Sequence, residues 1–320
     1  TTFEYPDDPK LLQEELLARF PHEALNIHRY FRDVSRVQGW IARWFVSKMF
    51  SAPLDYLLTI GSRHLACMTT SRYMDRISDP ELRAILTAQW PDFGARPKQS
   101  AFGVHSIVTG DYFHGGYYPI GGSQQIAIHA SRMVEKGGGN CLVNHEVTEI
   151  LCERRRAVGV RAIHKGKLVE FRSPLVISDA GAVNMFERLV PKDYCSKERE
   201  KANGIKPGVS AIILFLGLNA DPREHGFDDA NYWIYNRLDH DADEMANVAP
   251  EGLQIEGAFL SFGSTRNPEC QHHTAQIITF SDRAAWRAFD GGSWKRRGSA
   301  YDELKELIAS QMIDFVEERV

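Results

Sequence analysis

The sequence predicts a mixed α/β (α+β) fold, and three features of the chain indicate it. Helical periodicity dominates residues 1–114, short strands around a helix fill residues 115–194, and longer apolar strands followed by a charged helix occupy residues 195–320. A chain of 320 residues is long enough for roughly two domains with a substantial core. We therefore expect a helical segment, a smaller α/β segment and a strand-rich segment, in that order.

Helices are expected in the first segment because apolar residues recur there every three or four positions. Asp79-Pro80 is a typical helix start, since aspartate caps the first turn and proline fits its backbone angles. Pro91 and Pro97 then break the helical pattern. The five predicted helices span residues 9–20, 23–37, 38–50, 54–68 and 79–89.

In the middle segment one helix precedes a series of short strands. Ser123 is a suitable N-cap for this helix, and Gly137 stops it. Lys165-Gly166 predicts a tight turn between two strands of a hairpin. The predicted strands span residues 140–144, 147–152, 157–164, 167–171 and 175–178, and a second helix follows at 182–189.

The third segment contains longer apolar strands. Residues 209–218 form the longest apolar run, which is about half the length that crosses a membrane and therefore predicts a buried strand. The predicted strands span residues 210–218, 231–235, 254–261 and 275–280, and a charged helix closes the segment at 300–319.

Composition and charge exclude several classes of protein. Hydrophobic residues make up 43% of the chain, and a net charge of −4 creates no field that would attract nucleic acid. The five cysteines are scattered without a Cys-x-x-Cys pair, which favours reduced thiols and a cytoplasmic setting.

Metal and acyl-transfer sites are also unsupported. His272 and His273 are adjacent, so on a strand their rings point to opposite faces and cannot chelate one ion. No Gly-x-Ser-x-Gly elbow is present to expose a nucleophilic serine. We expect no metal site and no serine-hydrolase chemistry.

Residues 28–50 combine basic and aromatic side chains. Such a helix can lie in a membrane interface, with Trp40 and Trp44 at headgroup level and arginines toward anionic lipid. The same pattern also fits a helix that faces a protein core and exposes its arginines, and this reading is slightly favoured. The chain is thus expected to be cytoplasmic, with peripheral membrane contact through residues 28–50 as the open alternative.

The stretch from Tyr117 through Gly121-Gly122-Ser123, with the helix and strands that follow to Ala180, resembles a known family. It is similar to the second half of the FAD-binding domain of the phytoene desaturase, carotenoid isomerase and retinol saturase family, within the amine-oxidase-like flavoproteins. Residues 259–264 and 273–280 look like that family's substrate-domain strands. The resemblance implies that residues 115–194 form half of an FAD-binding domain. This half would be inserted between residues 1–114 and 195–320, and these two flanking segments would pack together as a substrate domain with helices and a mixed sheet.

The resemblance also implies site residues, but it identifies no catalytic acid or base among them. The residues implied to approach FAD are Gly121, Gly122, Val147, Asp179 and Ala180. The residues implied to line the substrate site are Tyr117, Tyr118, Phe215 and Phe262. Together with the strands at 210–218 and 254–261, the two tyrosines are expected to border an elongated apolar cavity.

A Gly-x-Gly-x-x-Gly turn, which holds the FAD pyrophosphate in the family, does not occur in the sequence. We therefore expect the chain to be a central piece of a longer enzyme and to be inactive and free of FAD by itself. The resemblance implies that the parent enzyme transfers a hydride at a carbon–carbon bond of a long apolar polyene. Desaturation, saturation and isomerisation all remain open.

Two other functions remain open. An amine-oxidase-like flavoenzyme acting on a polar amine shares the features around Gly121 and Gly122. A non-catalytic protein that binds an apolar ligand would need no glycine-rich phosphate turn.

Overall fold

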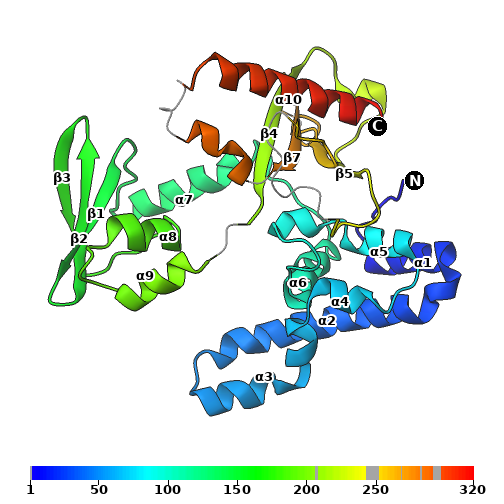
Figure 1. Ribbon diagram of the computed structural model, residues 1–320, viewed down its shortest axis with the longest axis horizontal. Coiled ribbons are helices and arrows are strands. Elements are labelled where there is room, and N and C mark those ends of the chain that lie inside the picture. Colours follow the sequence, from blue (N-terminus) through cyan, green and yellow to red (C-terminus); the bar gives the residue numbers. More distant parts are fainter. Residues whose placement is uncertain (1, 206–207, 243–251, 268, 282, 291–296) are drawn as a thin grey trace. The chain divides into compact units, whose positions relative to one another are not determined.

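The computed structural model describes residues 2–205, 208–242, 252–267, 269–281, 283–290 and 297–320 (Figure 1). The chain divides into two compact units. Unit 1 combines Thr1–Ser123 with Gly208–Val320, and unit 2 consists of Gln124–Pro207. The helical start of the chain and its strand-rich end therefore share one unit.

Unit 1 begins with α1 (Pro9–Arg19), the short turn η1 (Pro21–Glu23), α2 (Ala24–Ser47) and α3 (Ala52–Cys67). The sequence predicts two helices over residues 23–50, and this prediction is wrong because α2 continues through Gly39. This glycine lies on the exposed side of the helix, where it costs only about 1 kcal/mol relative to alanine.

The chain continues through α4 (Thr70–Met74), α5 (Pro80–Thr87), η2 (Trp90–Phe93) and α6 (Phe102–Tyr112). The predicted cap of α5 is present, because the Asp79 side chain accepts hydrogen bonds from the backbone N–H groups of Glu81 and Leu82. Helix α6 was not predicted. Its buried face carries His105, Ser106 and Thr109, whereas Val104 and Ile107 are exposed, so its sequence lacks the apolar periodicity of an amphipathic helix.

Aromatic rings fill the core of this helical part. Phe102 stacks on Tyr73 with ring centroids 3.7 Å apart, and both side chains have no exposed surface. The Tyr30 hydroxyl shares a 2.9 Å hydrogen bond with His105 Nε2. The rings therefore connect α2, α4 and α6 into one packed core.

Unit 2 contains α7 (Gln124–Lys136), the antiparallel sheet β1 (Glu146–Glu153), β2 (Arg156–His164) and β3 (Lys167–Arg172), and a helical end. The predicted meander and its Lys165-Gly166 turn are confirmed, and both turn residues have positive φ. The helical end consists of α8 (Ala182–Asn184), the π-helical turn η3 (Met185–Leu189) and α9 (Ser196–Asn203).

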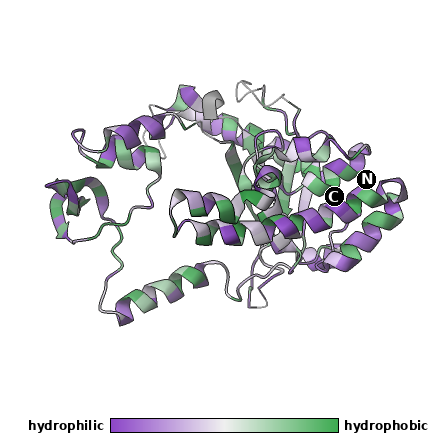
Figure 2. Cartoon of the chain, turned by 90° about the horizontal axis from the view of Figure 1, so that it is seen from below, coloured by the Kyte–Doolittle hydropathy of each residue, from purple (hydrophilic) through white to green (hydrophobic). Residues whose placement is uncertain are grey.

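Two predicted strands of unit 2, residues 140–144 and 175–178, do not form. A strand requires a hydrogen-bonded neighbour, and the described residues supply no further strand beside β1, β2 and β3 in this unit. Apolar side chains in both stretches face solvent, with Val143 77% and Ile177 87% exposed. Hydrophobic residues (green) also run along α7 at the lower left of Figure 2, and none of its residues is buried.

The rest of unit 1 is a four-stranded sheet with the order β4-β7-β6-β5. Its strands are β4 (Ser210–Leu218), β5 (Asn231–Tyr235), β6 (Gly257–Ser261) and β7 (His273–Ser281), accompanied by η4 (Pro222–His225), η6 (Arg283–Phe289) and α10 (Ser299–Glu317). One face of the sheet packs against Ile308, Met312 and other apolar residues of α10. All described strand pairs in this sheet are antiparallel, so the expectation of a mixed sheet is wrong.

Candidate substrate face and its cavity

The sheet of unit 1 has a second apolar face, opposite α10. Residues directly opposite each other on paired strands point to the same side, and one such row crosses all four strands. The row runs from Ile213 through Ile278 and Phe259 to Trp233. We call it the apolar row. Neighbouring strands are about 4.8 Å apart, so the apolar row extends over roughly 14 Å.

The apolar row is open at the β4 end and covered at the β5 end. Ile213 is 47% exposed, and Phe215, two residues further on the same strand face, is 74% exposed. At the other end the Tyr112 ring lies edge-on to Trp233 at 6.0 Å. Large apolar side chains facing solvent on a sheet commonly mark a binding surface.

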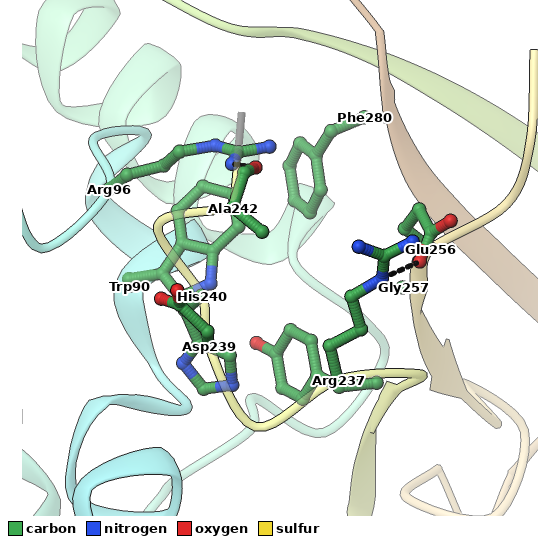
Figure 3. Close-up of a pocket in the computed structure, with 10 residues that line it drawn as sticks. Trp90, Arg96, Arg237, Asp239, His240, Ala242, Glu256, Gly257 and Phe280 are labelled. Carbon is green, nitrogen blue, oxygen red and sulfur yellow. Dashed lines mark hydrogen bonds and ion pairs between the residues drawn. The ribbon is translucent and has the colours of Figure 1, made fainter. Parts of the chain in front are cut away.

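A cavity of about 50 Å³ adjoins the covered end (Figure 3). The rings of Trp90 and Phe280 lie 5.3 Å apart at this cavity, and Tyr235 completes its aromatic wall. The other lining residues include the charged side chains Arg96, Arg237, Asp239 and Glu256. Arg237 and Glu256 form an ion pair at 3.2 Å, visible as a dashed line in Figure 3.

His240 gives the cavity a neutral imidazole. Burial lowers the pKa of His240 to about 4, so the ring is uncharged at neutral pH. The Thr87 hydroxyl donates its single proton to the Arg83 carbonyl at 2.8 Å and must therefore accept from His240 Nδ1 at 3.0 Å. His240 Nε2 is then left as a hydrogen-bond acceptor. The buried Trp90 N–H, which has no partner among the described residues, is a potential donor on the same cavity.

The structure separates the four residues expected to line the substrate site. Phe215 lies on the same face as the apolar row, whereas Phe262 is buried in the α10 core, with its ring 4.6 Å from that of Phe227. Tyr117 is 92% exposed, and Tyr118 lies beneath the Arg266 guanidinium at 5.8 Å. Neither tyrosine lines the cavity described above, which lies at Trp90 and Tyr235.

The expected cofactor residues fall in both units. Gly121 and Gly122 belong to unit 1 and have φ values of +83° and +87°, which only glycine adopts readily. The Gly121 N–H donates to Asn267 Oδ1 at 3.4 Å. Val147, Asp179 and Ala180 belong to unit 2, where Val147 lies in β1 and the other two precede α8.

Comparison with known proteins gives a consistent result, although no family model matches the chain. The chain is 28% identical over 332 residues to an all-trans-retinol 13,14-reductase of Danio rerio, covering 97% of this chain and 54% of that protein. The Homo sapiens protein of the same name is 28% identical over 336 residues, covering 98% of the chain and 55% of that protein.

The chain is also similar, at lower identity, to a prolycopene isomerase. Prolycopene isomerase 1, chloroplastic, of an Oncidium hybrid cultivar is 25% identical over 326 residues, covering 96% of this chain and 51% of that protein. This chain is thus similar in sequence to retinol 13,14-reductases and to a prolycopene isomerase. It spans about half the length of the curated relatives that it matches.

The fold comparison finds a solved structure with a related architecture. An oxidoreductase from Methanosarcina mazei superposes with a TM-score of 0.52 at 14% identity, covering 83% of this chain and 58% of that one. The mixed α/β architecture with two antiparallel sheets is therefore one that an oxidoreductase also adopts.

One part of a usual FAD site is absent from the sequence. FAD's pyrophosphate is usually bound at a glycine turn that opens a helix behind a parallel strand, and the sequence contains no Gly-x-Gly-x-x-Gly. The residues of this chain therefore do not supply the usual contacts to the FAD pyrophosphate.

Sequence reasoning did not find the residues around the cavity. Trp90 and Arg96 lie beside Pro91 and Pro97, which only mark the end of the helical pattern. The available signal was the strand 231–235, where alternate positions carry Trp233 and Tyr235 on one face. An aromatic face on a short strand indicates a wall that another element must cover or a ligand must contact.

Proposed function

We propose that this chain is part of an FAD-dependent oxidoreductase or isomerase that acts on a long apolar polyene of the carotenoid or retinoid type. The apolar row is the observation that supports this proposal, because it offers an extended hydrocarbon surface that is open at Phe215. Kinship with retinol reductases and prolycopene isomerases supports the same class of substrate.

The chain's own residues would bind and orient the polyene. Ile213, Ile278 and Phe259 would contact its hydrocarbon chain, while the Trp90 N–H and His240 Nε2 would hydrogen-bond a polar end group such as a hydroxyl. The flavin would supply the hydride chemistry when bound. Desaturation, saturation and isomerisation would all fit this arrangement.

We further propose that unit 2 docks against a dinucleotide-binding element of the same enzyme. The exposed apolar side chains of residues 141–143 and 175–177 would become buried strands of that element's parallel sheet. Without such a partner the chain would lack the phosphate contacts for FAD and would be inactive by itself.

The first prediction concerns the cofactor. The purified 320-residue chain should show no stoichiometric flavin absorbance band, because helix N-terminal phosphate contacts supply most of the affinity for the FAD pyrophosphate. The absorbance spectrum of the purified chain, before and after denaturation, measures this directly. A flavin band at one equivalent would contradict the proposed docking of unit 2.

The second prediction concerns the substrate face. All-trans-retinol should bind the chain saturably and quench its tryptophan fluorescence, since Trp233 ends the apolar row. Phe215→Asp should weaken binding about tenfold or more, because a carboxylate replaces an exposed apolar ring at the entrance. Phe171→Asp, at a 38% exposed phenylalanine of unit 2, is the matched control and should bind retinol normally. Equal affinities in both variants would place the ligand elsewhere.

An enzyme acting on a polar amine is the second candidate, because Asp239 and Glu256 bring two carboxylates to the cavity. Arg96 and Arg237 line the same cavity and Arg237 pairs with Glu256, so the site has no excess of negative charge. This balance favours the polyene over the amine.

A further inference from the structure

Helices α2 and α3 form an antiparallel hairpin that is polar inside and apolar outside. The α3 residues that face the protein interior are small or polar: Thr59, Ser62 and Ala66 are at most 4% exposed. The large apolar side chains of the hairpin instead face solvent. They are Phe45, Val46, Met49, Phe50, Leu54, Tyr56, Leu57, Leu58 and Ile60, and we call them the hairpin patch.

The hairpin patch is strongly exposed. Met49 is 82% exposed, Leu57 is 67% exposed and Phe45 is 63% exposed. In water this arrangement is unfavourable, because each exposed apolar side chain forgoes the free energy of burial. Large apolar side chains that gather exposed on one hairpin mark an interaction site.

Hydrogen bonds hold the two helices together from inside. Ser47, which has no exposed surface, donates to Asp55 Oδ1 at 2.5 Å. The Trp40 indole N–H donates to the Thr59 carbonyl, and Arg36 donates to Ser62 Oγ at 3.1 Å. The hairpin is therefore ordered by polar contacts and does not need its apolar side chains for its own packing.

The charge of the hairpin differs in sign from that of the chain. Between Arg36 and His64 the sequence has four cations, Arg36, Arg43, Lys48 and Arg63, and a single carboxylate, Asp55, for a net charge of +3, whereas the whole chain carries −4. Arg43 and Arg63 are exposed beside the hairpin patch. This combination of exposed apolar residues and cations is complementary to an anionic lipid surface.

We propose that the α2–α3 hairpin docks on an anionic lipid bilayer, with the hairpin patch inserted at the boundary between headgroups and acyl chains. Among the described helices none is long and apolar enough to cross a bilayer. The contact differs from the one expected for residues 28–50, because Tyr30, Phe31 and Trp40 are buried in the helical core.

Flotation of the full chain with lipid vesicles tests the proposal. The chain should float with vesicles that contain one third phosphatidylglycerol, and should float less with pure phosphatidylcholine or at high salt, because salt screens Arg43 and Arg63. The double variant Met49→Asp with Leu57→Asp should bind at least about tenfold more weakly, because two inserted apolar side chains become charged.

Leu25→Asp is the control, because Leu25 is 82% exposed at the opposite end of α2 and lies outside the hairpin patch. It should float like the wild type. Failure of the wild type to float at low salt would overturn the proposal, as would equal flotation of the double variant. Size-exclusion chromatography adds a further outcome. If the wild type is a dimer that the double variant disrupts, and the wild type does not bind vesicles, a second copy of the chain covers the hairpin patch. This result would also overturn the proposal.

Discussion

Replacing Phe102 by alanine should destabilise the protein by about 3–5 kcal/mol. Phe102 has no exposed surface and stacks on Tyr73 at 3.7 Å, so its removal leaves a cavity at the centre of the helical core. His105 and Tyr30 border the same space, with ring centroids 5.7 Å and 6.5 Å from that of Phe102, and their shared hydrogen bond limits collapse into it.

Urea unfolding monitored by circular dichroism measures this change. Phe215→Ala is the control, because that ring is 74% exposed and its loss should change the free energy of unfolding by no more than about 0.5 kcal/mol. A Phe102→Ala protein with a wild-type midpoint would show that the aromatic core is packed differently.

Glu23→Gln should cost about 3 kcal/mol at neutral pH. Glu23 is only 3% exposed, and its carboxylate accepts hydrogen bonds from Ser78, Asp79 and Asn26. Burial alone would raise the pKa of Glu23, but these hydrogen bonds outweigh it and lower the pKa from 4.5 to about 2. The carboxylate therefore joins the start of α2 to the turn before α5.

The same shift fixes how stability changes with pH. Because the pKa of Glu23 is lower in the folded state, its contribution is complete above pH 4.5 and disappears as the pH falls toward about 2. The difference in urea midpoint between wild type and Glu23→Gln should thus shrink across that window. A difference that stays constant from neutral to acid pH would contradict an ionised Glu23 in the folded protein.

Much of the fold was predictable from local sequence patterns. Strand β5 begins and ends where the sequence predicts, and the α5 cap follows from Asp79-Pro80. The failures have physical causes. Residues 140–144 and 175–178 have strand-like sequences, but the part of the chain that the structure describes offers them no neighbouring strand, and a propensity does not supply that neighbour. Helix α6 buries polar residues such as His105 and Thr109 and exposes Val104 and Ile107, so it lacks the apolar periodicity by which a helix is recognised.

The site was less predictable than the fold. Phe215 lies on the exposed strand face beside the apolar row, whereas Phe262 points to the opposite face, toward α10. One residue of register decides between the two faces of a strand, and only the pairing reveals it. The cavity depends on contacts between distant segments, such as Trp90 with Phe280 and Thr87 with His240, which no local pattern encodes.

A competition experiment tests most directly whether the apolar face binds a polyene. The chain is titrated with all-trans-retinol in the presence and absence of excess putrescine, a polar diamine, and tryptophan fluorescence is recorded for the wild type and for Phe215→Asp. We expect saturable quenching by retinol that putrescine does not displace and that Phe215→Asp weakens, because the ligand lies on an apolar sheet face. Binding of putrescine at the cavity of Asp239 and Glu256, with no saturable response to retinol, would contradict the polyene account and favour the amine-acting enzyme.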